Sequence, residues 1–236
     1  MTARRLRKGA SSAGHQAEQA KGISVSEVAY QNIIDALYRG RFVPGQRLIE
    51  ADIIRDFKLS RGSVREALKK LAAEGVVARS LHRGAQIRWL SRAEAEDALS
   101  LLELVIGFAG RLAAIKIDEG DHRSRFATIS EHLVSLDRLE HMQLEILAAR
   151  DQFFRTMVEV GGNRVLRRLY PSMQSHLLRV QLRAFPVACT DYEDMAGSIL
   201  GSDPVRAEQS CRAHLRRLRR GLRTLPKEAF APEDGY

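Results

Sequence analysis

Apolar residues recur at helical spacing near the start of the chain and then give way to short strand-like runs. Between Val25 and Leu37 they follow one another at spacings of three and four, which predicts a helix that Gly40 ends. The further elements predicted in this region are helices at about 50–57 and 60–75 and strands at 46–48, 76–79 and 85–89, with a hairpin at 80–84. This order is typical of a winged helix-turn-helix.

From Ser91 onward the pattern predicts helices only. Ser91 and Glu94 have the spacing of a capping box, which starts a helix. The helices are predicted near 92–118, 122–139, 142–160, 163–184, 191–200 and 203–223. We therefore expect a mainly α fold, with an N-terminal winged helix-turn-helix and a C-terminal all-helical bundle. The expected organisation is a flexible basic arm at 1–22, the winged domain at 23–90, the helical domain at 91–225 and a loose tail at 226–236.

The distribution of charge separates these two parts. The formal net charge is +9 over 236 residues. Residues 1–90 hold 17 Lys and Arg against 8 Asp and Glu, so the whole excess lies there, and residues 91–236 are neutral in sum. A basic module joined to a neutral one predicts an anionic partner such as nucleic acid for the first module.

Composition excludes several other classes of protein. The only cysteines are Cys189 and Cys211, without metal-ligand spacing, so a disulfide scaffold or a zinc ribbon is ruled out and we expect inert core thiols. No apolar run approaches the ~20 residues that a membrane span needs, and no apolar stretch follows the basic start. We expect a cytoplasmic protein with no membrane partner.

The segment that begins at Ser60 carries the clearest functional signal. Ser60 is a helix cap, and the N-terminus of a helix favours a phosphate. Arg61 and Arg65 are four residues apart and share one face of the helix, with Ser63 near the same end. The apolar residues that follow face the other way. This is the arrangement of a recognition helix in the major groove of DNA.

Residues 25–89 resemble the GntR family of bacterial transcription regulators. The resemblance rests on fixed spacings between residues 25 and 89, among them Phe42-x-Pro44-Gly45, Ser60-Arg61-x-x-Val64-Arg65-Glu66-Ala67-Leu68 and Arg83-Gly84-Ala85. It implies a dimer on a short palindromic operator, with the Ser60–Arg65 end in the major groove. It also implies that the wing tip at Arg83 and Gly84 reaches the minor groove.

The second half resembles the FCD-type effector domain of the FadR-like branch of that family. The resemblance implies a helical bundle in which many members hold a divalent metal through one aspartate and three histidines. In this chain the four ligand positions are Asp151, Arg155, Tyr192 and His214. A charged arginine is no ligand and tyrosine replaces imidazole poorly, so only Asp151 and His214 remain as metal candidates. We expect no cofactor and no bound divalent metal.

The same four residues are interpreted as an effector site. Arg155 keeps a positive charge where relatives hold a metal, so it is expected to bind the carboxylate or phosphate of a small anionic metabolite. Tyr192 and His214 would supply hydrogen bonds. The alternative is that Asp151 and Arg155 form a structural ion pair beside a cavity that has closed.

These features together predict a ligand-responsive bacterial transcription regulator rather than an enzyme. We expect a repressor that binds a palindromic operator of double-stranded DNA as a homodimer and responds to a small metabolite in its helical domain. The alternative is a constitutive or architectural DNA-binding protein whose helical domain only dimerises. A metal-dependent hydrolase would need ligands and a nucleophile that the sequence does not provide.

Overall fold

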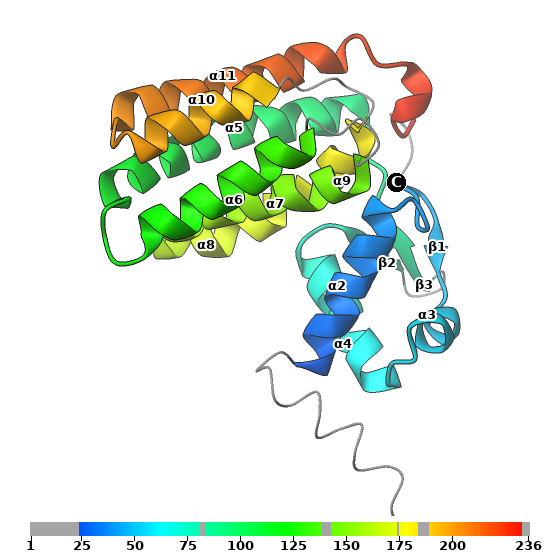
Figure 1. Cartoon of the computed structure of the whole chain (residues 1–236). Coiled ribbons are helices and arrows are strands. Elements are labelled where there is room, and N and C mark those ends of the chain that lie inside the picture. Colours follow the sequence, from blue (N-terminus) through cyan, green and yellow to red (C-terminus); the bar gives the residue numbers. More distant parts are fainter. Residues whose placement is uncertain (1–23, 81–83, 138–142, 174, 184–188, 233–236) are drawn as a thin grey trace, which may run out of the picture.

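The computed structural model describes residues 24–80, 84–137, 143–173, 175–183 and 189–232. It has two parts, a small winged domain built from the N-terminal elements and a larger bundle of helices beside it (Figure 1). The predicted basic arm at 1–22 lies outside the described residues. The predicted fold class, a winged helix-turn-helix followed by an all-helical domain, is confirmed.

The winged domain packs three helices against a small antiparallel sheet. Its elements are α2 (Val25–Tyr38), β1 (Arg47–Leu48), α3 (Glu50–Phe57), α4 (Arg61–Ala73), β2 (Val77–Ser80) and β3 (Gly84–Ile87). The strand order is β1-β3-β2, so β3 lies between its neighbours and pairs with both. The apolar stripe of α2 that the sequence predicts is buried, with Ile33 and Leu37 at 0% exposure. Burial of this stripe holds the other elements in place.

The helical domain begins at a capping box. The Ser91 side chain accepts from the backbone N–H of Glu94, and the Glu94 carboxylate accepts from the Ser91 N–H, as the sequence predicts. The helices are α5 (Arg92–Lys116), α6 (His122–Asp137), α7 (Gln143–Val160), α8 (Arg164–Leu169), α9 (Ser175–Gln181), α10 (Cys189–Leu200) and α11 (Pro204–Leu222). Of these, α5 and α11 share the most extensive contact. A Cβ on Gly110 would come within 2.6 Å of the Cys211 sulfur, so glycine permits their close approach.

The helix predicted at 163–184 is broken in the structure. Asn163 caps α8, which ends at Leu169, and a 3-10 turn over Tyr170–Met173 leads to α9. Pro171 lies in that turn. Proline has no amide hydrogen to donate, and its ring clashes with the carbonyl four residues earlier. The apolar spacing continues across the break, which is why periodicity alone predicted one helix.

Helix α5 requires a qualification of the membrane prediction. One 18-residue window of this helix has a mean hydropathy of 1.8, so by length and composition it is apolar enough to cross a bilayer. Half of that window is buried inside the protein. The helix also contains Glu103, whose carboxylate pairs with Arg216 of α11 at 2.7 Å. Its apolar character fits a core helix of the bundle.

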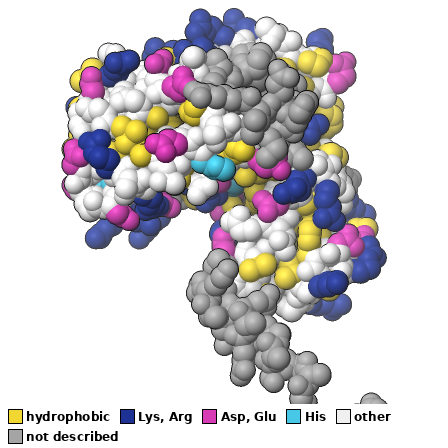
Figure 2. All heavy atoms as spheres, viewed as in Figure 1, with side chains coloured by type: hydrophobic (Ala, Val, Ile, Leu, Met, Phe, Trp, Pro, Cys, Tyr) yellow, Lys and Arg dark blue, Asp and Glu magenta, His cyan; other side chains and the backbone are white. Residues whose placement is uncertain are grey.

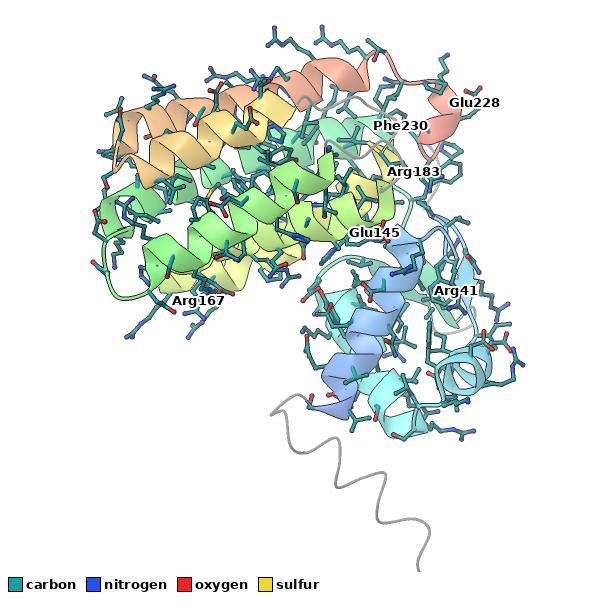
Figure 3. The ribbon with its side chains drawn as sticks, viewed as in Figure 1. Arg41, Glu145, Arg167, Arg183, Glu228 and Phe230 are labelled. Atoms are coloured by element: carbon teal, nitrogen blue, oxygen red, sulfur yellow. The ribbon has the colours of Figure 1, made fainter. Side chains whose placement is uncertain are left out.

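Among the described residues the C-terminal segment is packed at 229–231, whereas the sequence predicted a loose tail at 226–236. A 3-10 turn over Lys227–Ala229 is followed by Phe230, which is 4% exposed. The Ala231 N–H donates to the Leu90 carbonyl at 3.0 Å. The C-terminal segment therefore binds the linker between the two domains. In Figure 3 the labelled Phe230 lies at the end of the bundle that adjoins the winged domain.

Candidate functional site

Helix α4 has the form of a recognition helix. The Ser60 hydroxyl accepts from the Ser63 N–H at 3.1 Å and lies 2.7 Å from the Ser63 hydroxyl. The back of the helix is buried through Val64, Ala67, Leu68 and Leu71. Arg61 and Arg65 are exposed. The helix is thus fixed by its apolar back, while its capped N-terminus and two arginines remain open to a partner.

Arg65 makes one ion pair within the winged domain. Its Nε lies 3.0 Å from Glu50 Oε2 at the start of α3, and the Arg65 side chain is 55% exposed. An exposed pair of this kind contributes about 0–1 kcal/mol. Arg65 can therefore exchange Glu50 for a phosphate or a guanine edge at little cost. Figure 2 shows Lys and Arg side chains gathered along the outer edge of the winged domain.

The wing is present, but its tip is described only in part. Arg83 lies outside the described residues, so its predicted contact stays a prediction. Gly84 opens β3 with φ at +77°, a left-handed conformation that L side chains rarely adopt. Gly84 is exposed, and among the described residues the nearest atom to a Cβ there would be Arg47 Nε, at 4.0 Å. Backbone conformation, more than crowding, accounts for glycine at this position.

Two further arginines, which the sequence pattern alone does not single out, lie beside the wing. Arg47 of β1 pairs with Gln86, and Arg79 of β2 pairs with Ala85, so both flank β3. Both are exposed and line a hollow that Gly84 also borders. The signal was available in the sequence, because each arginine stands on a predicted strand next to the wing. Its significance depends on strand order, which the sequence pattern does not give.

The bundle contains a pocket between α5, α7, α9, α10 and α11. Its interior leaves a volume of about 70 Å³ for the centres of water molecules, and the pocket is also open to solvent on one side. Most of its walls are apolar, from Leu99, Leu102, Ile106, Leu147, Phe154, Leu178, Leu182, Leu215 and Leu218. The polar groups are those of Arg150, Tyr170, Ser175, Arg179, Tyr192 and His214. A mainly apolar cavity with a few polar groups is typical of a small-molecule site.

Of the four predicted effector residues, Tyr192 and His214 line this pocket. Their ring centroids are 5.1 Å apart, and Phe154 packs against both rings. The guanidinium carbon of Arg150 lies 5.4 Å from the Tyr192 ring centroid. The pocket face of α7 therefore carries Arg150 and Phe154, one residue before each member of the predicted pair. Successive side chains of a helix point about 100° apart, so a pair that begins one residue later faces a different side of the helix.

His214 is held as a neutral ring. Burial lowers its pKa, although the neighbouring Asp191 carboxylate acts in the opposite direction. The His214 Nδ1 lies 3.0 Å from Asp191 Oδ2, and Arg217 Nε donates to the same oxygen at 2.9 Å. With its Nδ1–H donating to Asp191, a neutral ring keeps Nε2 as a hydrogen-bond acceptor.

Asp151 and Arg155 lie outside the lining of the pocket. Arg155 Nε donates to Asp151 Oδ2 at 2.6 Å, the ion pair that the sequence analysis weighed as the alternative. Burial opposes ionisation of Asp151, yet Arg179, His176 and Arg155 hold the pKa of this carboxyl below its ordinary value. Arg155 also donates to His176 of α9. The predicted constellation is thus divided between the pocket and the junction with the winged domain.

The pocket residues do not fit a divalent metal. Among the described residues no three His, Cys, Asp or Glu side chains come together as a ligand cluster. The pocket lining supplies one neutral imidazole, together with the cationic side chains of Arg150 and Arg179. Asp151, the other metal candidate, is engaged with two arginines. A cation would meet repulsion rather than a ligand set here.

Two families of known proteins match the chain. Residues 25–87 match the bacterial regulatory proteins of the gntR family, and residues 97–217 match the FCD domain. Two solved structures share the fold. A putative GntR transcriptional regulator from Rhodococcus sp. RHA1 has a TM-score of 0.70 at 21% identity, covering 86% of this chain and 100% of that one. For E. coli McbR/YncC the TM-score is 0.67 at 16% identity, with coverage of 84% and 94%.

Curated relatives are similar at low identity. A probable D-xylose utilization operon transcriptional repressor from Paenarthrobacter nicotinovorans is 25% identical over 190 residues, which is 78% of this chain and 82% of the relative. The uncharacterized HTH-type transcriptional regulator YdhC from Bacillus subtilis (strain 168) is 24% identical over 143 residues, which is 59% of this chain and 62% of that protein. Both relatives are named as transcription regulators rather than enzymes.

Proposed function

The chain belongs to the GntR family of bacterial transcription regulators with an FCD domain, and on that premise we propose that it is a ligand-responsive repressor. It binds a palindromic operator in the cytoplasm as a homodimer, and a small anionic metabolite in the helical domain controls this binding. The observation that carries the proposal is α4, with its buried back, its capped N-terminus and its two exposed arginines. The name of the xylose-operon relative supports repression.

Replacement of Arg65 tests the DNA interface. Arg65→Ala removes a guanidinium from the exposed face of α4 and leaves the buried face intact. Loss of a base or phosphate contact costs about 1–3 kcal/mol, so the operator affinity of the full chain should fall by about fivefold or more. The measurement is fluorescence anisotropy with DNA from the promoter region of the protein's own gene, at a fixed salt concentration.

Arg167→Ala is the matched control, because it removes the same charge from an exposed position. Arg167 lies on α8 and points away from the molecule, at the end of the bundle far from α4 (Figure 3). Its operator affinity should stay within about twofold of the wild type. Equal affinities for the Arg65 and Arg167 variants would contradict the assignment of α4 as the recognition helix.

The pocket supports an effector with an apolar body and one anionic group. Its walls are mainly apolar, while Arg150 and Arg179 in its lining provide positive charge. A carboxylate or phosphate fits the guanidinium groups, and the Tyr192 and Tyr170 hydroxyls and neutral His214 offer neutral hydrogen bonds. The site residues proposed for the effector are therefore Arg150, Arg179, Tyr192 and His214. Asp151 and Arg155 lie outside this site, at the junction between the bundle and the winged domain.

Thermal unfolding with octanoate tests this ligand class. Binding to the folded state alone stabilises the protein by about 2.7 kcal/mol at a ligand concentration 100 times Kd. We expect octanoate and related carboxylates to raise the melting temperature, octanamide to do so less, and Arg150→Gln to remove the difference. If no carboxylate or phosphate stabilises the protein or changes operator binding, the constitutive DNA-binding protein becomes the better description.

The exposed face of α5 supports a homodimer. Large apolar side chains on it recur at spacings of three, four and seven, namely Leu101 (51% exposed), Leu104 (53%), Phe108 (44%) and Ile115 (58%). Such a stripe is typical of a helix that packs against a second helix. A twofold dimer places two copies of α4 to match the two halves of a palindrome.

A further inference from the structure

A buried polar cluster crosses the junction between the two domains. Tyr30 and Tyr38 of α2 and His176 of α9 are each no more than 3% exposed. The Tyr38 hydroxyl lies 2.6 Å from His176 Nδ1, and the Tyr30 hydroxyl lies 3.2 Å from His176 Nε2. Buried hydrogen bonds of this kind have no water to replace them. The cluster therefore fixes α2, and with it the winged domain, against the bundle.

The cluster extends to the end of the recognition helix. The Tyr30 hydroxyl donates to Glu74 Oε2 at 2.6 Å. Glu74 is the C-terminal cap of α4 and is itself buried, at 8% exposure. Arg155 Nη2 donates to His176 Nε2 at 3.1 Å and reaches the Tyr30 hydroxyl at 3.5 Å. One arginine of α7 thus touches both the histidine of α9 and the tyrosine that holds α4.

In the other direction the cluster reaches the pocket. Arg155 pairs with Asp151, whose other oxygen lies 2.9 Å from Arg179 Nη1. Arg179 Nη2 donates to the Tyr170 hydroxyl at 2.8 Å. Both Arg179 and Tyr170 line the pocket. A continuous series of polar contacts therefore runs from the pocket through Asp151 and Arg155 to the junction.

The pair between Asp151 and Arg179 is the poorly satisfied step in this series. Asp151 Oδ1 and Arg179 Nη1 are buried and close together, but neither atom makes a hydrogen bond to a described residue. Their contact rests on charge without alignment. A buried charged atom that lacks a hydrogen bond gains by acquiring one. Arg179 is therefore the group in this series best placed to accept a new anionic partner.

We propose that Arg179 transmits occupancy of the pocket to the DNA-binding domain. An anion that binds the Arg179 guanidinium draws it from Asp151, and Asp151 then holds Arg155 more closely. Arg155 in turn loses its contacts with His176 and Tyr30. This loss weakens the hold of the bundle on α2 and, through the Tyr30–Glu74 hydrogen bond, on the end of α4. This inference rests on the proposed function only for the presence of an anionic effector.

Hydrogen exchange on the full chain, without DNA or effector, tests the relay separately from operator binding. Arg179→Gln removes the charge that holds Asp151 and so imitates capture of Arg179 by an anion. Exchange in α2 and in the last turn of α4 should accelerate at least about tenfold, while α6 and α10 should keep wild-type rates. Wild-type exchange rates in α2 would overturn the proposal.

Arg150→Gln is the matched control. It removes the same charge from the lining of the same pocket, at a position outside the series of contacts that runs through Asp151. Its exchange in α2 should stay within about twofold of the wild type. Equal acceleration in both variants would mean that any loss of charge in the pocket loosens the protein, and the relay through Arg179 would be rejected.

Tyr30→Phe provides a second variant in case Arg179→Gln does not fold. It removes one hydroxyl at the far end of the series and keeps the ring, over which Lys70 Nζ lies at 3.9 Å from the centroid. Exchange in α9 should accelerate, and unchanged rates would refute the link. If the relay exists, the double variant Arg179→Gln/Tyr30→Phe should exchange in α2 no faster than the faster of the two single variants. If the two substitutions acted independently, the factors by which they accelerate exchange would instead multiply.

Discussion

At the scale of the residue, His176 is the side chain on which acid should act most directly. Burial lowers its pKa to about 4, and Arg179 and Arg155 nearby act in the same direction. In the unfolded chain the ordinary value is 6.5. Between these values the unfolded chain binds a proton that the folded protein does not. The contribution of His176 to stability is therefore complete above about pH 6.5 and is lost as the pH falls towards 4.

Stability against urea should consequently depend on pH through His176. A shift of this size predicts a loss of about 2 kcal/mol between pH 7 and pH 5. In His176→Gln this part of the pH dependence should be absent, which unfolding curves at both pH values would measure. If the variant loses as much stability as the wild type over this range, other groups carry the effect.

Residues whose role depends on local sequence were the ones that could be predicted. The capping of α4 by Ser60 and the exposure of Arg61 and Arg65 follow from spacing within one helix, and the structure shows both. The pocket face of α7 was placed one residue away, because Asp151 and Arg155 have the same spacing as Arg150 and Phe154. A single sequence does not show which of two such pairs faces inward.

At the scale of the element, the long helices were predicted well because their apolar stripes are continuous. The structure gives 92–116 for α5 and 204–222 for α11, against predictions of 92–118 and 203–223. The stripe at Leu99, Leu102 and Ile106 is buried in the core. The opposite side of α5 carries the exposed apolar face. The sequence did not predict this face, because a helix that is apolar on both sides shows little periodicity.

Replacement of an exposed leucine on α5 tests the proposed dimer. Leu104→Glu places a charge in the middle of the apolar face and leaves the buried side unchanged. We expect the wild-type protein to sediment as a dimer and the variant as a monomer at the same concentration. Val165→Glu on α8, where valine is 73% exposed, is the control and should remain dimeric. A dimeric Leu104 variant would locate the interface elsewhere.

At the scale of the whole molecule, the C-terminal segment joins parts that are far apart in the sequence. Its Ala229 carbonyl accepts from Trp89 Nε1 at 3.2 Å and from Gln181 Nε2 at 3.1 Å. Gln181 also bonds both backbone groups of Leu90, at 3.1 and 3.0 Å. The linker is thus held by α9 and by the end of the chain together. Such long-range pairing leaves no periodic signal, so the sequence predicted a loose tail.

Removal of residues 226–236 should therefore destabilise the protein. The deletion breaks three hydrogen bonds to the linker and α9, each worth about 1 kcal/mol. It also exposes the apolar surface that the buried Phe230 side chain covers. A loss of about 2–4 kcal/mol should appear as a lower melting temperature by circular dichroism. Deletion of 233–236 alone spares every one of these contacts and should leave the melting temperature unchanged. An equal fall in melting temperature for the two deletions would show that the contacts of the C-terminal segment at 229–231 do not stabilise the linker.

The position of Trp89 has a practical consequence. It is the only tryptophan in the 236 residues, and it lies in the linker with its indole N–H on the C-terminal segment. Ultraviolet emission excited near 295 nm therefore comes from one place in the molecule, the linker between the winged domain and the helical bundle. Titrations of the unlabelled protein with operator or metabolite can therefore report changes at the linker through the emission of Trp89.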